Sequence, residues 1–147
     1  MHTVRLPSGH EISDDRARLD MDYVVASLGK TYWAHDRPRA LLERSWANCL
    51  PIGLYAPPGH QGGRQQGFAR ILTDYALRAH LGDVFLDPSI RGQGLGKTLI
   101  ATILAHPDLT TVGNWTLTTR DAHGLYTQYG FTPGQDDGHW MILNKPN

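Results

Sequence analysis

The stretch with the clearest chemical use is a glycine-rich loop that follows an apolar run and precedes a segment of helical period. The first turn of a helix carries backbone N–H groups without partners and about half a positive charge. Glycines let a ligand approach that backbone, and an arginine offers a planar guanidinium that fits phosphate oxygens. The loop therefore predicts a binding site for an anion such as a pyrophosphate. Its residues are Arg91, Gly92, Gln93, Gly94, Leu95, Gly96 and Lys97.

Three glycine-rich motifs compete for this loop. The dinucleotide-binding pattern G-x-G-x-x-G requires an acidic residue about 20 positions further on, and residues 112–119 contain no Asp or Glu. The phosphate-binding pattern G-x-x-x-x-G-K-[ST] ends as residues 96–98 do, but its first glycine would fall at Arg91. A third pattern, [QR]-x-x-G-x-[GA], is matched by Arg91, Gly94 and Gly96. In this pattern the loop resembles the acetyl-coenzyme A pyrophosphate loop of the GNAT superfamily of N-acetyltransferases.

A second block of sequence, at 119–131, strengthens that resemblance. It is similar to the superfamily's other signature, N-x-x-A-x-x-[LF]-Y-x-x-x-G-F, although Thr119 stands where the pattern has asparagine. Two such patterns in this order, about 30 residues apart, are far more specific than either alone. The resemblance covers roughly residues 50 to 133. The matching residues of the second block are Ala122, Leu125, Tyr126, Gly130 and Phe131.

The resemblance implies an acyltransferase that uses acetyl-coenzyme A as acyl donor and needs no metal. The acetyl group would pass to a primary amine of a small molecule or a peptide, by direct attack in a ternary complex. In this superfamily the strand before the loop parts from its neighbour, and its exposed backbone pairs with the pantetheine arm. Here that strand is Val84-Phe85-Leu86. The backbone N–H of Leu86 is the group expected to polarise the thioester carbonyl.

Tyr126 and Asp83 are the predicted catalytic side chains. The coenzyme leaves as a thiolate, and a phenol with a pKa of about 10 can protonate a thiol of pKa about 8.5. An alkyl ammonium of pKa about 10.4 must lose a proton before it attacks, and Asp83 precedes the strand that would carry the thioester. The alternatives are a core tyrosine at 126, and an aspartate that caps a turn or pairs with Arg78. His80 and His123 are alternative bases, and Asp121 is expected to be a helix N-cap.

Tyr32 and Trp33 are the predicted acceptor-binding residues. They lie with His35 in a loop at 30–35 between two expected helices, where members of this superfamily often bind the acceptor. Aromatic faces suit a cationic or an aromatic amine. The alternative is that both are ordinary core or surface aromatic residues.

Composition restricts the possible partners and compartment. The 14 basic and 14 acidic residues balance, which gives no electrostatic sign of nucleic acid or of an anionic membrane as a partner. No apolar run approaches the roughly 18 residues of a membrane span, and the N-terminal residues have no signal-peptide core. Cys49 is the single cysteine, which excludes an internal disulfide and fits a reducing compartment, and it is expected to be a small core residue. We expect a cytoplasmic, metal-free monomer or homodimer.

The chain length of 147 residues fits one domain, 1–147. Apolar patterns and turn residues predict a first helix capped at 13–15 and ending at Gly29, and a second capped by Asp36. The order of elements, with one crossover helix, implies a mixed sheet covered on both faces. The expected class is therefore α+β. This order is also the one that the resemblance implies, namely a GNAT-like fold with a central twisted sheet of about 6–7 strands, about 4 helices and a strand–glycine loop–helix–strand crossover. The remaining expected strands are around Val4 and Leu6 and at 51–55, 66–72, 80–86, 115–118 and 140–143, and the remaining helices are at 95–105 and 121–129.

Two other functions stay open at this point. One is a P-loop-like nucleotide-binding module that uses Gly96-Lys97-Thr98, although the chain lacks an apolar strand ending in an acid that could hold magnesium. The other is a non-catalytic coenzyme A sensor on the same fold, because a fold alone does not determine activity.

Overall fold

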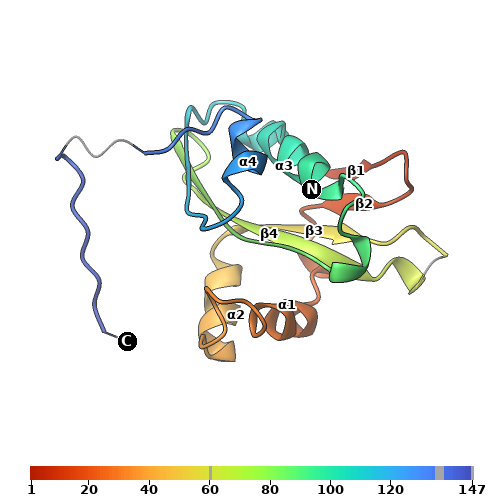
Figure 1. Cartoon of the computed structure of the whole chain (residues 1–147). Helices are drawn as coiled ribbons and strands as arrows, with labels where there is room; N and C mark the ends of the chain where they lie inside the picture. Colours follow the sequence, from red (N-terminus) through yellow and green to blue (C-terminus); the bar gives the residue numbers. More distant parts are fainter. Residues whose placement is uncertain (60, 135–137, 147) are drawn as a thin grey trace.

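A mixed sheet forms the centre of the molecule (Figure 1). The computed structural model describes residues 1–59, 61–134 and 138–146, and within these residues six strands follow one another in chain order. Neighbouring strands are antiparallel from β1 to β5, whereas β5 and β6 are parallel because a helix connects them. The strands are β1 Thr3–Arg5, β2 Glu11–Ser13, β3 Leu50–Tyr55, β4 Gln65–Thr73, β5 Arg78–Leu86 and β6 Asn114–Leu117.

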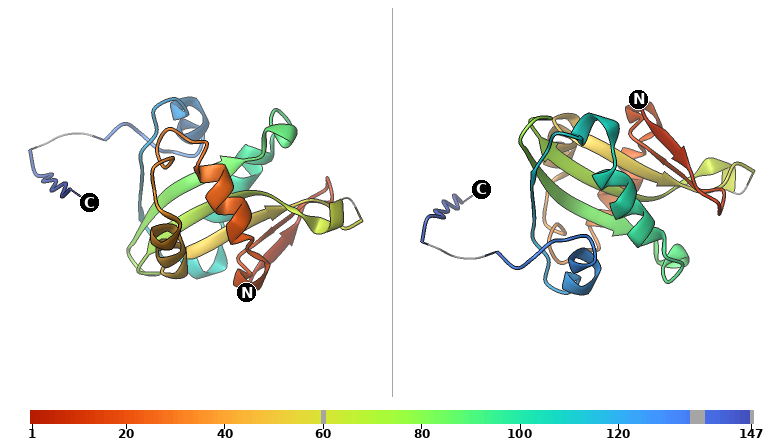
Figure 2. Two further views of the ribbon diagram at one scale, coloured as in Figure 1. Left: turned by 90° about the horizontal axis from the view of Figure 1, so that it is seen from below. Right: turned by 90° about the horizontal axis from the view of Figure 1, so that it is seen from above.

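Helices cover both faces of the sheet (Figure 2). Helices α1 (Met21–Leu28) and α2 (Arg39–Ala47) lie on one face, and α3 (Leu95–Leu104) and α4 (His123–Thr127) lie on the other. Each face has its own apolar core: Trp46 packs against Phe68 on the first, and Leu99, Ile100 and Ile103 are buried on the second. The expected fold class, a mixed sheet between helices with a strand–loop–helix–strand crossover, is confirmed.

The conformation of β5 departs from a regular strand at Asp83. Asp83 has a φ of +51°, in the left-handed region that non-glycine residues rarely adopt. At this point two steps along β4, from Phe68 to Arg70, match three steps along β5, from Phe85 back to Gly82, which is a β-bulge. Strand β6 pairs with Arg78–Leu81 only. The second half of β5, from Gly82 to Leu86, therefore runs on beyond its parallel neighbour.

Several boundaries near the N-terminus differ from the prediction. Strand β2 was not expected, because three residues are too few to show a period. The first helix begins at Met21 and is capped by Asp20, whereas Asp15 caps a separate short 3-10 turn. The second helix is preceded by Pro38 rather than capped by Asp36.

The predicted closing strand at 140–143 is wrong. These four residues belong to no strand, and their exposed fractions range from 66% at Trp140 to 93% at Met141. Residues 138–146 form no helix or strand, and Trp140 lines a pocket together with residues of β4, β5 and β6. A run of apolar residues predicts burial against the sheet, but it does not specify which strand edge is within reach. Among the described residues, no helix has the length and apolar character that crossing a membrane requires.

Candidate active site

A cavity of about 460 Å³ lies where β5 and β6 part. Its walls come from the bulged half of β5, from the segment between β6 and α4, and from the loop between α1 and α2. The residues that line the cavity include Tyr32, Trp33, Arg37, Arg70, His80, Asp83, Val84, Arg120, Asp121 and Tyr126. Predicted catalytic and acceptor-binding residues from three distant parts of the sequence thus border one space.

The glycine loop presents its backbone without obstruction. Gly92 and Gly94 have φ values of +77° and +78°, and a Cβ added at either would meet no described atom within 4 Å. Gly94 occupies the N-cap position of α3 and, as a glycine, has no side chain that could cap the first N–H groups of the helix. At Gly96 a Cβ would lie 3.2 Å from the side chain of Leu86, so this glycine lets α3 pack closely on β5. The first N–H groups of α3 therefore remain available to a ligand.

Arg91 is fixed at the end of β5. Its Nε donates to the carbonyl oxygen of Leu86 at 3.0 Å, and its guanidinium lies 5.6 Å from the centre of the Phe85 ring. The terminal nitrogens make no hydrogen bond within the described part of the chain, so they are free to meet an anion beside the loop.

A hydrogen bond joins the two signature segments. The hydroxyl of Tyr129 donates to the carbonyl oxygen of Lys97 at 2.8 Å, across 32 residues of sequence. Sequence reasoning missed this contact, since a tyrosine near the end of a helical pattern gives no sign of its partner.

The predicted pantetheine strand has its side chains packed and its backbone open on one side. Phe85 stacks on Phe68 in the core beneath α1 and α2, with the two ring centres 5.2 Å apart. Val84 and Leu86 pack against the core beneath α3. Because β6 ends opposite Leu81, no strand of the described residues neighbours the edge of β5 from Gly82 to Leu86 on that side. An extended ligand could pair with this edge as an added strand.

Tyr126 lies between the main cavity and a second cavity of about 350 Å³, and it lines both. Its ring meets Phe131 edge-on at 5.9 Å. Burial raises the pKa of the phenol above its ordinary value of 10.0. The hydroxyl makes no hydrogen bond with any described residue. Tyr126 therefore holds its proton at neutral pH and has no protein acceptor for it.

Thr119, which replaces the asparagine of the signature, shapes the turn before α4. Its Oγ1 accepts a hydrogen bond from the backbone N–H of Ala122 at 3.0 Å. The prediction that Asp121 caps this helix is wrong, because Ala122 occupies the N-cap position without a side-chain cap. Helix α4 is also shorter than the predicted 121–129, since it spans His123–Thr127.

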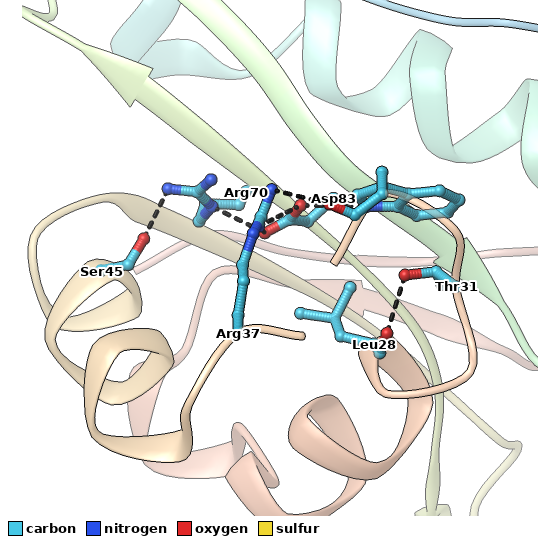
Figure 3. A network of polar contacts seen from close by, with 7 residues as sticks. Leu28, Thr31, Arg37, Ser45, Arg70 and Asp83 are labelled. Carbon is cyan, nitrogen blue, oxygen red and sulfur yellow. Dashed lines mark hydrogen bonds and ion pairs between the residues drawn. The ribbon is translucent and has the colours of Figure 1, made fainter. Parts of the chain in front are cut away.

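Asp83 is the centre of a buried polar network (Figure 3). Its carboxylate accepts from Arg70 Nε at 3.0 Å, from Arg37 Nη1 at 3.1 and 3.3 Å, and from Trp33 Nε1 at 3.2 Å. Arg70 in turn donates from Nη1 to Ser45 Oγ at 2.6 Å. The network joins β4, β5, α2 and the 30–37 loop. The alternative pairing of Asp83 with Arg78 does not occur.

His80 and Tyr32 complete the cavity wall. The Nδ1 atom of His80 lies 2.8 Å from Thr116 Oγ1. Burial, followed by the nearby charge of Arg70, lowers the pKa of His80 below its ordinary value of 6.5, so the imidazole is neutral at neutral pH. The rings of Tyr32 and Trp33 meet edge-on with their centres 5.2 Å apart. The guanidinium carbon of Arg120 lies 3.7 Å from the centre of the Tyr32 ring.

Cys49 is a buried core residue, as expected. It lies in the core beneath α1 and α2, and burial raises the pKa of its thiol to about 11. A thiol with such a pKa is protonated at neutral pH and is not a nucleophile.

The sequence model of the acetyltransferase (GNAT) domain matches residues 59–133, which contain the glycine loop, the bulged strand and the second signature. The chain belongs to the GNAT acetyltransferase family. Acetyltransferase activity accords with this membership, and the resemblance seen in the two signatures is confirmed.

The family likeness extends over almost the whole chain. A crystal structure from Xanthomonas campestris pv. campestris, assigned to the GNAT family, is 40% identical with a TM-score of 0.84, and the alignment covers 93% of this chain and 94% of that one.

Two soybean (Glycine max) proteins also match. Histone acetyltransferase TAP1 is 40% identical over 67% of this chain and 46% of its own length. Probable acetyltransferase TAP2 is 41% identical over 53% of this chain and 33% of its own length. The alignments thus span less than half the length of these curated relatives.

Proposed function

We propose that this GNAT-family protein transfers an acetyl group from acetyl-coenzyme A to a primary amine of a small molecule or a peptide, within a ternary complex. The observation that carries the proposal is Tyr126, a buried residue that lines the same cavity as the open edge of β5 and whose hydroxyl makes no hydrogen bond with a described residue. GNAT proteins normally use acetyl-coenzyme A, and two features of this chain suit it.

The first feature is the loop from Arg91 to Lys97. Its unobstructed glycines and the free terminal nitrogens of Arg91 fit a pyrophosphate, and a hydrogen bond to a charged group contributes about 1.5–3 kcal/mol. The second is the edge of β5 from Gly82 to Leu86, which suits an extended pantetheine arm. A backbone N–H on this edge, that of Leu86, is our candidate to polarise the thioester carbonyl.

The transfer forms a bond from the amine nitrogen to the carbonyl carbon and breaks the bond from that carbon to sulfur. We assign the protonation of the leaving thiolate to Tyr126. Because burial keeps its pKa above 10.0, the phenol stays protonated over the whole physiological range. The acid role needs a hydroxyl that is not already committed, and this one is not.

The proton of the attacking ammonium needs an acceptor, and two groups border the cavity. Asp83, the predicted base, has its oxygens engaged by Arg37, Arg70 and Trp33. His80 is neutral, and only its Nδ1 has a hydrogen-bond partner among the described residues. We therefore assign the proton to His80, directly or through water, and we assign Asp83 the role of holding the bulge of β5.

Mass spectrometry of a library of amines incubated with acetyl-coenzyme A tests the proposal. We expect one class of amine to gain an acetyl group, and we expect acetyl-coenzyme A, but not ATP with magnesium, to raise the melting temperature. Stabilisation by ATP with magnesium alone would instead support a nucleotide-binding module on Gly96-Lys97-Thr98. Stabilisation by acetyl-coenzyme A without any acetylated product would support a coenzyme A sensor.

A protein lysine is one acceptor to include, since TAP1 carries the name histone acetyltransferase. A single cysteine suits a reducing compartment, and we propose the cytoplasm and a monomer or homodimer.

A further inference from the structure

The main cavity has an excess of positive charge. Three arginines, Arg37, Arg70 and Arg120, are among the residues that line it, against two aspartates, Asp83 and Asp121. His80 adds no charge at neutral pH, because burial and the charge of Arg70 lower its pKa. The surrounding side chains therefore carry one more positive than negative charge.

One carboxylate has to serve two of these guanidiniums. Asp83 accepts from Arg37 and from Arg70, and its side chain is only 3% exposed. Arg70 donates from Nε to Asp83 and from Nη1 to Ser45, while its Nη2 makes no hydrogen bond with a described residue. A Cβ built on Gly82 would lie 3.8 Å from that nitrogen, which places the free donor beside the open half of β5.

Arg120 has no carboxylate partner in the described part of the chain. Its guanidinium lies over the ring of Tyr32 at 3.7 Å, a contact that holds the planar group and leaves its N–H donors unused. Tyr32 itself meets Trp33, whose Nε1 is bonded to Asp83. The aromatic pair expected to bind the acceptor thus supports a guanidinium of a residue that lines the cavity.

We propose that the acceptor amine carries an anionic group, a carboxylate or a phosphate, which binds to Arg120. This inference rests on the proposed acetyl transfer and specifies its substrate. A guanidinium pairs with either anion through two parallel hydrogen bonds. A second cation on the acceptor, as in a polyamine or a lysine-rich peptide, would meet the excess positive charge. A volume of about 460 Å³ suits a small molecule rather than a long chain.

Matched pairs of amines test the charge requirement. Aminoethyl phosphate is compared with ethanolamine, and an α-amino acid with its carboxamide, with spermidine as the polycationic case. We expect kcat/KM to be at least about tenfold higher for the anionic member of a pair, which corresponds to about 1.4 kcal/mol. The two pairs separate phosphate from carboxylate as the preferred anion. Equal values within both pairs, or a preference for spermidine, would overturn the inference.

Arg120→Gln tests the assignment of the residue. We expect the anionic preference to fall toward unity in this variant and to be partly kept in Arg120→Lys, which retains the charge without the planar fork. Arg44→Gln removes the same charge from an exposed position outside the cavity lining and should leave the ratio as it is. A preference that survives Arg120→Gln unchanged would exclude Arg120 as the anion-binding group.

A binding measurement keeps this inference separable from the proposed reaction. Titration of aminoethyl phosphate into the coenzyme-loaded protein requires no turnover. We expect binding that Arg120→Gln weakens about tenfold. If no amine is acetylated but this binding holds, the acetyl transfer fails and the anion site stands. If amines are acetylated without any anionic preference or Arg120-dependent binding, the anion site fails and the acetyl transfer stands.

Discussion

Arg70 donates from Nε to the carboxylate of Asp83 at 3.0 Å across two neighbouring strands, at the point where the register of β4 and β5 shifts. Asp83 has a φ of +51°, a conformation that costs about 1–3 kcal/mol and persists only where surrounding contacts enforce it. Arg70, Arg37 and Trp33 supply those contacts. The ion pair therefore stabilises the bulge beyond which β5 loses its parallel neighbour, and the network links the 30–37 loop to β5.

Asp83→Asn should destabilise the protein while preserving the shape of the bulge. Asparagine tolerates positive φ, so the loss reports the charge that two guanidiniums share. We expect unfolding to become easier by about 1–3 kcal/mol, measured by urea denaturation. Asp83→Ala removes both acceptor oxygens, whereas asparagine keeps one, and alanine also tolerates positive φ poorly, so Asp83→Ala should cost more. Equal losses in the two variants would mean that backbone strain plays no part.

The pH dependence of the rate separates the roles of His80 and Asp83. If neutral His80 accepts the ammonium proton, His80→Gln should lower the rate most near neutral pH and least at alkaline pH, where the free amine is already present. If Asp83 only holds the bulge, Asp83→Asn should reduce the rate by the same factor at every pH. A deficit in Asp83→Asn that disappears at high pH would return the base to Asp83. The same amine must be used for all three proteins.

The central unit of the fold was predictable from sequence because its signals are local. A β-branched and aromatic run, three closely spaced glycines and an apolar stripe of helical period together predicted β5, the loop and α3. The network around Asp83 was not predictable, since its donors lie 13, 46 and 50 residues away along the chain. An arginine inside a strand pattern, as at position 70, was the one available signal. Trp140–Leu143 misled the prediction because an apolar pattern specifies a need for burial but not a partner.

Gly94→Val should abolish the thermal shift caused by acetyl-coenzyme A. The added side chain would project into space that no described atom occupies, where we place the pyrophosphate, and valine would also be strained at a φ of +78°. Gly113→Val, at a glycine with open space and no positive φ outside this loop, is the matched control and should keep the shift. A ligand-induced shift that persists in Gly94→Val would mean that the pyrophosphate binds elsewhere.

Acid should destabilise the protein through Asp14, which lies far in sequence from its partner His106. The two side chains are 7% and 2% exposed and meet at 2.9 Å, and the backbone N–H of His2 also donates to Asp14. Burial alone would raise the pKa of Asp14, but these hydrogen bonds outweigh it and hold the pKa below 3.8. A depressed pKa in the folded state stabilises the protein above pH 3.8, and this contribution is lost as the pH falls through the folded value.

Asp14→Asn should therefore cost about 1–3 kcal/mol at pH 7 and flatten the decline in stability between pH 4 and 2, as measured by urea denaturation. An unchanged acid limb would show that other carboxyl groups govern it.

Tyr126→Phe should lower kcat and leave the affinity for acetyl-coenzyme A almost unchanged. The ring and its contact with Phe131 stay, and only the hydroxyl proton is lost. General acid catalysis contributes about 10²–10⁴-fold, and a thiolate is a tolerable leaving group, so we expect a loss near 10²-fold.

Tyr129→Phe is the matched control. It removes the hydrogen bond to Lys97, so it should raise KM for the coenzyme more than it lowers kcat. Because burial raises the pKa of Tyr126 above its ordinary value, any alkaline decline in the wild-type rate caused by loss of this proton should begin at a higher pH than for an exposed phenol. Unaltered turnover in Tyr126→Phe would leave Tyr126 as a core residue and would require another source for the thiol proton.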